Sequence, residues 1–223
     1  EAMTSAGVDD GSALLVLGFE SADHPVDAWI ERGVEIARAH GGVAPDGIAI
    51  SGPRDDGGRA GSDGAVGAWR SAFLRAPYGR DAMVRMSVIV ETFETACTWD
   101  QFPGLHADVT KSVVQTALAV GADPAVITCR FTHVYPDGPA PYFTVLAPGR
   151  EPDQLVQWQA IKDAASAALA RGNGTITHHH AVGRDHRPWY DEQRPAPFAA
   201  ALRAAKQTVD PSGILNPGVL IDA

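Results

Sequence analysis

The chain has 223 residues, of which 45% are hydrophobic and 20% are charged, as is ordinary for a globular protein with a buried core. Its formal net charge of −9 argues against nucleic-acid binding as the main role. The sequence contains no apolar run of the roughly 18 residues that a membrane-spanning helix needs, and no signal-peptide pattern at its start. The two cysteines lack the spacing of a zinc site or a disulfide framework. We therefore expect a cytoplasmic protein.

The N-terminal part of the chain predicts a strand, a helix and a loop. Residues Ala13–Glu20 form a compact apolar run that is typical of a buried strand. A helix is expected to start at Asp23–Pro25, where a proline suits the first turn, and to end at His40–Gly42. The glycine-rich stretch Arg54–Gly67 predicts a loop, and Trp69–Arg75 is expected to be helical.

The following elements have the order β-α-β-β-α-β. They are expected at Met86–Thr95, Leu105–Val120, Ala125–Val134, Pro141–Ala147, Asp153–Arg171 and Thr175–His178. The turn "YPDGPA" joins the two middle strands into a hairpin. This order is the split βαβ plan of ferredoxin-like folds. The predicted class is α+β, with a ferredoxin-like antiparallel sheet and helices packed on one face.

The domain boundaries follow from this order. We expect one domain over residues 1–223, with its core at residues 85–180. A C-terminal helical segment at 181–223 follows, and it includes a helix at Pro195–Val209.

Three consecutive histidines, His178, His179 and His180, are the most conspicuous polar feature. On a strand, neighbouring side chains point to opposite faces, so a single metal ion could not easily collect all three. We therefore predict no metal site. Two interpretations remain: histidines at a polar strand end that bond to backbone groups, or an active-site cluster, because imidazole titrates near neutral pH and can move protons.

Two further residues are candidates for a site. Arg80 precedes the strand at Met86–Thr95, where an arginine serves equally well as a structural ion-pair partner or as a ligand for an anionic group. Tyr142 lies on a strand of the same expected sheet as the histidines. A tyrosine there is more commonly a packing residue than an acid or base.

Taken together, these segments resemble a known family. "THHHAVGRDHRPWYDEQ" and "AAKQTVDPSGILNP" resemble the C-terminal (cap) domain of the alkyldihydroxyacetonephosphate synthase family, which belongs to the FAD-linked oxidases. "VETFETACTWDQF" and "CRFTHVYPDGPAPYFTV" resemble a strand and a strand pair of the same family. The triple histidine is the most specific element of the resemblance.

The resemblance implies an FAD-dependent transferase. Its reaction exchanges the acyl chain of acyl-dihydroxyacetone phosphate for a fatty alcohol in ether-lipid synthesis. The catalytic positions of the family fall on Tyr142 and His178–His180, and its substrate-binding arginine falls on Arg80. The resemblance also assigns His180 and Asn216 to the cofactor side.

The resemblance implies partners as well. FAD would be held mainly by an N-terminal FAD-binding domain that has no counterpart in this chain, so the fragment is expected to be inactive alone. The expected substrate is a lipid-like phosphate. Peripheral membrane contact and a homodimer are left open.

Two alternatives stay open. The terminal "LNPG" resembles D-lactate and glycolate dehydrogenases, which favours the cap domain of an FAD-dependent 2-hydroxy-acid dehydrogenase. The lack of a recognisable FAD-binding segment favours a ferredoxin-like binding module without catalytic activity.

Overall fold

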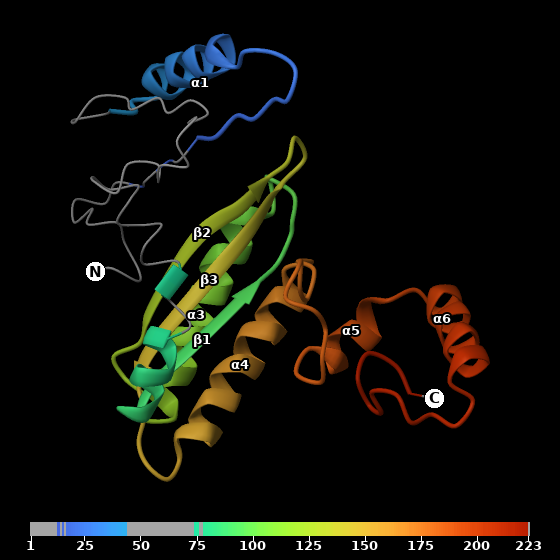
Figure 1. The fold of residues 1–223 in the computed structure, drawn as a ribbon. Coiled ribbons are helices and arrows are strands. Elements are labelled where there is room, and N and C mark those ends of the chain that lie inside the picture. Colours follow the sequence, from blue (N-terminus) through green and yellow to red (C-terminus); the bar gives the residue numbers. More distant parts are fainter. Residues whose placement is uncertain (1–12, 14, 16, 44–73, 76–77, 223) are drawn as a thin grey trace. The chain divides into compact units, whose positions relative to one another are not determined.

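The computed structural model describes residues 13, 15, 17–43, 74–75 and 78–222. The chain divides into two compact units, Glu1–Pro77 and Tyr78–Ala223. The second unit contains the sheet and all of the candidate site residues (Figure 1). The predicted loop at Arg54–Gly67, and residues 69–73 of the helix expected after it, lie outside the described residues.

The first unit contains helix α1 (Asp27–Ala39), which confirms the helix predicted after Asp23–Pro25. The strand predicted at Ala13–Glu20 is wrong at its described positions, where no strand is formed. The ring of Phe19 instead lies 6.3 Å from the ring of Trp29 on α1. This apolar run therefore packs against a helix, and it gains no strand partner among the described residues.

The second unit is built on an antiparallel sheet of β1 (Val88–Glu94), β2 (Val126–Val134) and β3 (Pro139–Pro148), in the order β1-β3-β2. The turn predicted between β2 and β3 is closed by a hydrogen bond of 3.0 Å from the Tyr135 N–H to the Gly138 carbonyl. The strand register places Glu94, Tyr142 and Arg130 side by side across the three strands.

Helices α3 (Phe102–Ala119) and α4 (Gln154–Arg171) pack on each other and on one face of this sheet (Figure 1). The rings of Phe93 and Phe143 stack 5.1 Å apart under them. The core also contains aliphatic residues from both helices: Leu105, Val109, Val113, Ile161, Ala165 and Leu169. Burial of each large side chain contributes about 1.5–3 kcal/mol to folding. The arrangement confirms the predicted α+β class with helices on one face.

The fourth strand, predicted at Thr175–His178, is wrong. The segment lies beside the end of β1, where a fourth ferredoxin-like strand would be, but one backbone hydrogen bond joins them, from the Thr175 N–H to the Ala96 carbonyl (3.0 Å). The N–H groups that follow bond to the side chain of Glu94 and not to a neighbouring strand. A side-chain acceptor has replaced the strand ladder.

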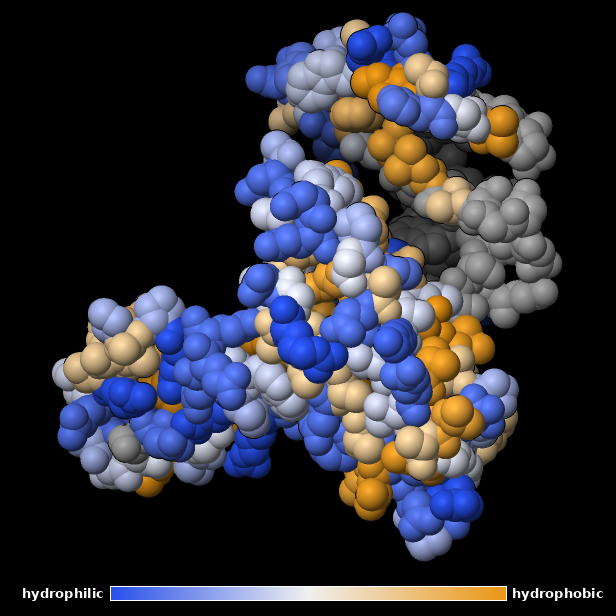
Figure 2. All heavy atoms as spheres, turned by 180° about the vertical axis from the view of Figure 1, so that it is seen from behind, coloured by the Kyte–Doolittle hydropathy of each residue, from blue (hydrophilic) through white to orange (hydrophobic). Residues whose placement is uncertain are grey.

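The C-terminal segment contains α5 (Arg187–Gln193), which the sequence did not predict, and α6 (Ala196–Val209), which it did. Gln193 ties α5 to the end of α4 by donating to the Gly174 carbonyl (2.8 Å) and accepting from the Ile176 N–H (2.9 Å). Arg187 pairs with Asp222 at 2.5 Å. The surface of this segment, at the left of Figure 2, is mostly hydrophilic. Among the described helices, none combines the length and apolar character needed to cross a membrane.

Candidate active site

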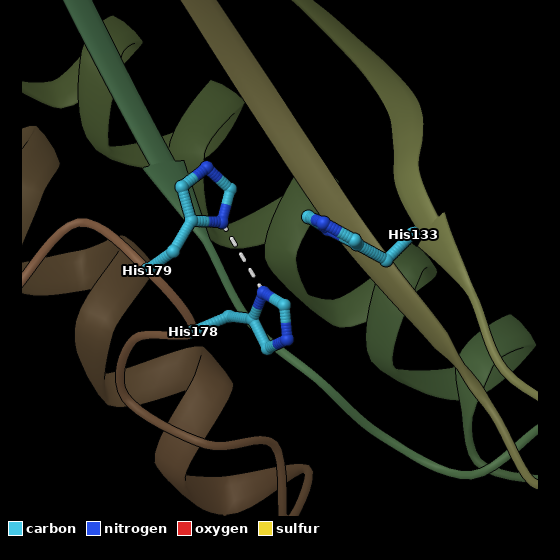
Figure 3. Close-up of side chains that lie close together, drawn as sticks. All are labelled: His133, His178 and His179. Atoms are coloured by element: carbon cyan, nitrogen blue, oxygen red, sulfur yellow. Dashed lines mark hydrogen bonds between the residues drawn. The ribbon is translucent and has the colours of Figure 1, made fainter. Parts of the chain in front are cut away.

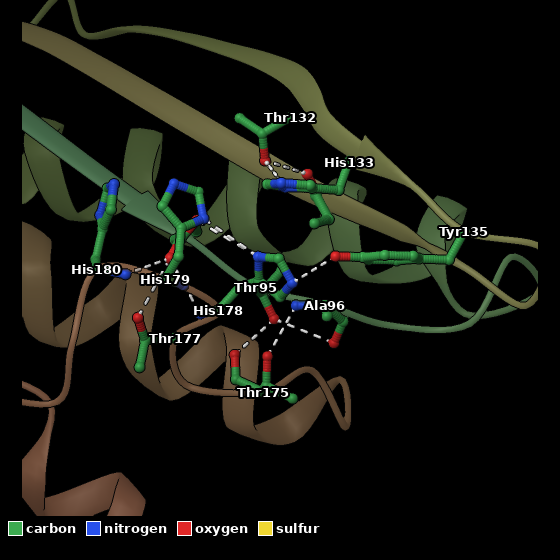
Figure 4. A network of polar contacts seen from close by, with 12 residues as sticks. Thr95, Ala96, Thr132, His133, Tyr135, Thr175, Thr177, His178, His179 and His180 are labelled. Atoms are coloured by element: carbon green, nitrogen blue, oxygen red, sulfur yellow. Dashed lines mark hydrogen bonds and ion pairs between the residues drawn. The ribbon is translucent and has the colours of Figure 1, made fainter. Parts of the chain in front are cut away.

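The site begins with a buried carboxylate at the end of β1. Glu94 Oε1 accepts the backbone N–H groups of three consecutive histidines: His178 at 3.1 Å, His180 at 2.6 Å and His179 between them. The loop that carries these histidines lies between the sheet and α4 (Figure 4). Successive amides that point to one acceptor form a concave anion-binding nest. The backbone of the histidine run therefore curls around Glu94.

Glu94 is ionised at neutral pH. Burial would raise the pKa of its carboxyl group, but the amide hydrogen bonds of His179 and His180, helped by their rings when these are protonated, outweigh burial and hold this pKa below its usual range. Oε2 lies 2.5 Å from His179 Nδ1. That contact lacks the alignment of a hydrogen bond, so Oε2 has no hydrogen-bond partner among the described atoms.

The rings of His178 and His179 meet a third histidine from the end of β2. Their Nδ1 atoms lie 3.2 Å apart, and the ring of His133 is 4.9 Å from that of His178 (Figure 3). On its other side, His178 Nε2 lies 3.1 Å from the hydroxyl of Tyr135. Tyr135 and His133 stack nearly parallel, with ring centres 5.9 Å apart. These aromatic contacts fix the plane of His178.

Tyr142 faces the last residue of the run. Its ring meets that of His180 edge to face, with centres 5.1 Å apart, and the guanidinium carbon of Arg130 lies 4.3 Å from the ring centre of Tyr142. Within the part of the chain that the structure describes, neither the Tyr142 hydroxyl nor the His180 ring makes a hydrogen bond. Both have hydrogen-bonding capacity for a ligand.

His180 is neutral at neutral pH. Burial lowers the pKa of its imidazole most, electrostatic interactions with His179, Lys162 and His186 lower it further, and Glu94 opposes them. Burial likewise lowers the pKa of His186, whose Nδ1 lies 3.0 Å from the Ala181 carbonyl. A neutral imidazole beside a tyrosine can accept a proton.

The histidines also bear on the question of a metal. The ligand atoms of His133, His178 and His179 lie within 4.8 Å of one another, as do those of Glu94, His179 and His180. The expectation that alternating faces keep the three consecutive imidazoles apart was wrong, because their segment is not a strand. His179 belongs to both groups and already contacts Glu94. The absence of a metal site stays a prediction.

Comparison with known proteins places the chain in a family. Residues 2–220 match the family described as "FAD linked oxidases, C-terminal domain". The chain belongs to this family. Its domain is 33% identical over 147 residues to alkyldihydroxyacetonephosphate synthase of Caenorhabditis elegans, which covers 65% of this chain and 25% of that protein. The synthase of Dictyostelium discoideum is 28% identical over 153 residues, covering 69% of this chain and 25% of the relative.

A solved structure agrees at the level of the fold. A structure of alkyldihydroxyacetonephosphate synthase matches with a TM-score of 0.50 and 21% identity, covering 67% of this chain and 24% of that one. At this identity the likeness shows the fold alone. The FAD-linked oxidase domain spans about a quarter of the length of the curated relatives that it matches.

The structure of this FAD-linked oxidase domain brings Tyr142 and His178–His180 into one cluster, whereas Arg80 and Asn216 lie outside it. Arg80 is exposed on helical residues 78–85, which precede the start of β1, whereas Glu94 ends that strand, about 20 Å along it. Asn216 is exposed in a turn after α6, where its carbonyl accepts the Val219 N–H at 3.1 Å. Among the described residues, no hydrogen bond or ion pair joins Arg80 or Asn216 to the cluster. Their assigned roles stay predictions.

Four residues of the cluster were not named as site residues from the sequence: Glu94, Arg130, His133 and Tyr135. A signal existed for Glu94, because a carboxylate inside the apolar run "VIVETFET" must find a partner when buried. Arg130 could have been found by counting back from the predicted hairpin turn to the residue opposite Tyr142. His133 and Tyr135 meet the run through tertiary packing, which no local pattern indicates.

A hollow of about 280 Å³ adjoins the cluster beside Tyr135. It is lined by the loop after β1 and the turn between β2 and β3, including Cys97, Asp137 and Gly138. Burial, and secondarily the charge of Asp100, raise the pKa of the Cys97 thiol. The thiolate is disfavoured there, so Cys97 is a poor candidate for a nucleophile.

Proposed function

We propose that this domain is the cap part of an FAD-dependent enzyme of the alkyldihydroxyacetonephosphate synthase type. The enzyme exchanges the acyl chain of acyl-dihydroxyacetone phosphate for a fatty alcohol. Family membership and the relatives of that name support an FAD-linked enzyme. The observation that carries the proposal is the pair of His180 and Tyr142, a neutral imidazole against a phenol, with ring centres 5.1 Å apart.

The residues present fit a flavin. The half-buried rings of His180 and Tyr142 have hydrogen-bonding capacity that no other described residue uses, which suits the polar edge of an isoalloxazine ring. We propose that an N-terminal FAD-binding domain of the full-length protein holds most of the cofactor, with His180 and Asn216 on the cap side. When bound, FAD supplies the electron-accepting chemistry, and the protein supplies orientation and proton transfer.

The side chains of this domain would then have separate roles in proton transfer and substrate binding. His180 accepts the proton from the carbon next to the substrate carbonyl, since a base needs a pKa near or below the working pH. The Tyr142 hydroxyl donates a hydrogen bond to a substrate oxygen. A guanidinium can hold a phosphate or a departing carboxylate in a bidentate fashion, but Arg80 precedes the start of β1 and does not reach the cluster at its end, so its substrate-binding role stays a separate prediction.

The test is an exchange assay with the full-length protein loaded with FAD. Incubation of palmitoyl-dihydroxyacetone phosphate with radiolabelled hexadecanol should give labelled alkyl product and free palmitate, without net reduction of the flavin. Flavin bleaching is followed in parallel with D-lactate and glycolate. Bleaching by a 2-hydroxy acid, with no alkyl product, would show that the dehydrogenase alternative is correct.

A further inference from the structure

Glu94 contacts the histidine run through both of its carboxylate oxygens, yet the proposed reaction gives it no part. Oε1 accepts the three backbone amides, while Oε2 lies 2.5 Å from His179 Nδ1 and 4.0 Å from His178 Nδ1. The side chain is fully buried. We propose that Glu94 is the positioning residue of this site: it shapes the backbone of residues 178–180 and orients His179, so that His180 faces Tyr142 as the proton acceptor. The part concerning His180 rests on the proposed function, and the part concerning the backbone does not.

The backbone around Glu94 has a shape that needs an external support. Buried N–H groups must find acceptors, and those of residues 178–180 find Glu94 instead of a strand. Immediately after them, Ala181 adopts a φ of 68°, a left-handed conformation that a residue with a Cβ keeps only when its surroundings enforce it. The Thr177 hydroxyl adds a longer contact to the same carboxylate oxygen, at 3.5 Å. Glu94 is the common acceptor of the whole turn.

The charges around His180 decide the sign of a pH test. The groups that act on His180 come from several neighbouring elements: Glu94 on β1, Tyr142 on β3, Lys162 on α4, His186 before α5, and His179 in its own loop. Burial lowers the pKa of His180 most, and Glu94 is the group that raises it. Loss of the Glu94 charge should therefore lower this pKa further.

The first experiment measures the pH dependence of kcat/KM for exchange in the full-length, FAD-loaded protein. Glu94→Gln keeps the size of the side chain and removes its charge. Because His180 must be neutral to accept a proton, the acidic limb of the profile should move to lower pH. The value of kcat/KM should fall on the order of 10²-fold, as a small misplacement of a reacting group does. Glu94→Asp, which keeps the charge, should return the limb toward its wild-type position while the rate stays reduced.

Glu91→Gln is the matched control. Glu91 is a buried carboxylate on the same strand, but it pairs with Lys162 at 2.6 Å on the side of α4. Its loss should lower thermal stability, because it leaves a buried charge without its partner. The acidic limb of the pH profile should move less than in Glu94→Gln, because Glu91 contacts Lys162 and no residue of the histidine run.

A second measurement does not depend on activity. Amide hydrogen exchange, followed by mass spectrometry on peptides that cover residues 177–181, should be faster in Glu94→Gln than in the wild type, and unchanged there in Glu91→Gln. If the wild-type protein shows no exchange of alcohol for acyl chain, the proposed function fails, and the amide exchange still decides the role of Glu94. Wild-type amide protection in Glu94→Gln and Glu94→Asp, or an unmoved acidic limb in an active Glu94→Gln enzyme, would overturn the proposal.

Discussion

At the scale of single residues, the sequence indicated the side chains with acid–base chemistry, but it did not indicate the residues that tertiary packing brings beside them. Three adjacent imidazoles and a strand tyrosine could be selected from the sequence, and the structure brings His180 and Tyr142 into contact. The carboxylate that organises them was not selected, because Glu94 and the run are joined by backbone amides. Every residue except proline has a backbone N–H group, so a sequence pattern cannot show which of these groups a carboxylate will bind.

Removal of the Tyr142 hydroxyl tests whether this single group takes part in the proposed reaction. Tyr142→Phe keeps the ring packed against His180 and Arg130 but removes the hydrogen-bond donor. In the full-length enzyme we expect kcat for exchange to fall by about 10²- to 10³-fold, the usual effect of removing one hydrogen-bond donor to an oxygen that gains charge in the reaction. The matched control is Tyr190→Phe, which removes a hydroxyl from α5, outside the cluster. Wild-type kcat in Tyr142→Phe would exclude the hydroxyl from catalysis.

The order of helices and strands from β1 to α4 could be predicted from the sequence. Each element shows the apolar periodicity of a helix or a strand, and turn residues mark its ends. The predicted strand at Thr175–His178 failed for a tertiary reason: the competing acceptor, Glu94, lies about 80 residues earlier in the chain. Helix α5 was missed because it is only seven residues long, too short for an apolar stripe to be recognised. Local patterns thus predict the elements that pack an apolar face against the core. They fail for segments whose conformation depends on hydrogen bonds to individual side chains.

The turn between β2 and β3 offers a test of how tightly the elements are packed near the site. A Cβ at Gly138 would lie 1.9 Å from the Cys97 carbonyl oxygen and 3.0 Å from the Thr98 Cα, so Gly138→Ala must displace the loop after β1. Overpacking of this kind costs about 1–3 kcal/mol. Thermal unfolding followed by circular dichroism should show a lower Tm.

Gly104→Ala is the matched control for that prediction. Gly104 lies in the first turn of α3, and a Cβ there would meet no heavy atom within 4 Å among the described contacts. Alanine in place of glycine in a helix should stabilise it by about 0.5–1 kcal/mol, so Tm should rise slightly. Equal changes of Tm in the two variants would show that the turn is not closely packed.

The whole molecule is a domain that needs further protein for its proposed chemistry. It belongs to the FAD-linked oxidase C-terminal family, and it spans about a quarter of the length of its curated relatives. The contribution that we propose for it is a set of acid–base side chains at the end of its sheet and in the loop that follows α4. The central claim is therefore about proton transfer by His180, with Tyr142 beside it and Glu94 behind it.

The most direct measurement is the loss of tritium from C1 of labelled palmitoyl-dihydroxyacetone phosphate to water. It uses the full-length, FAD-loaded protein without added alcohol and compares the wild type with His180→Gln. We expect the wild type to release tritium, and His180→Gln to release it at least about 10²-fold more slowly, because the proton acceptor is gone. Substrate binding should be retained in that variant. Release of tritium by His180→Gln at the wild-type rate would contradict the account.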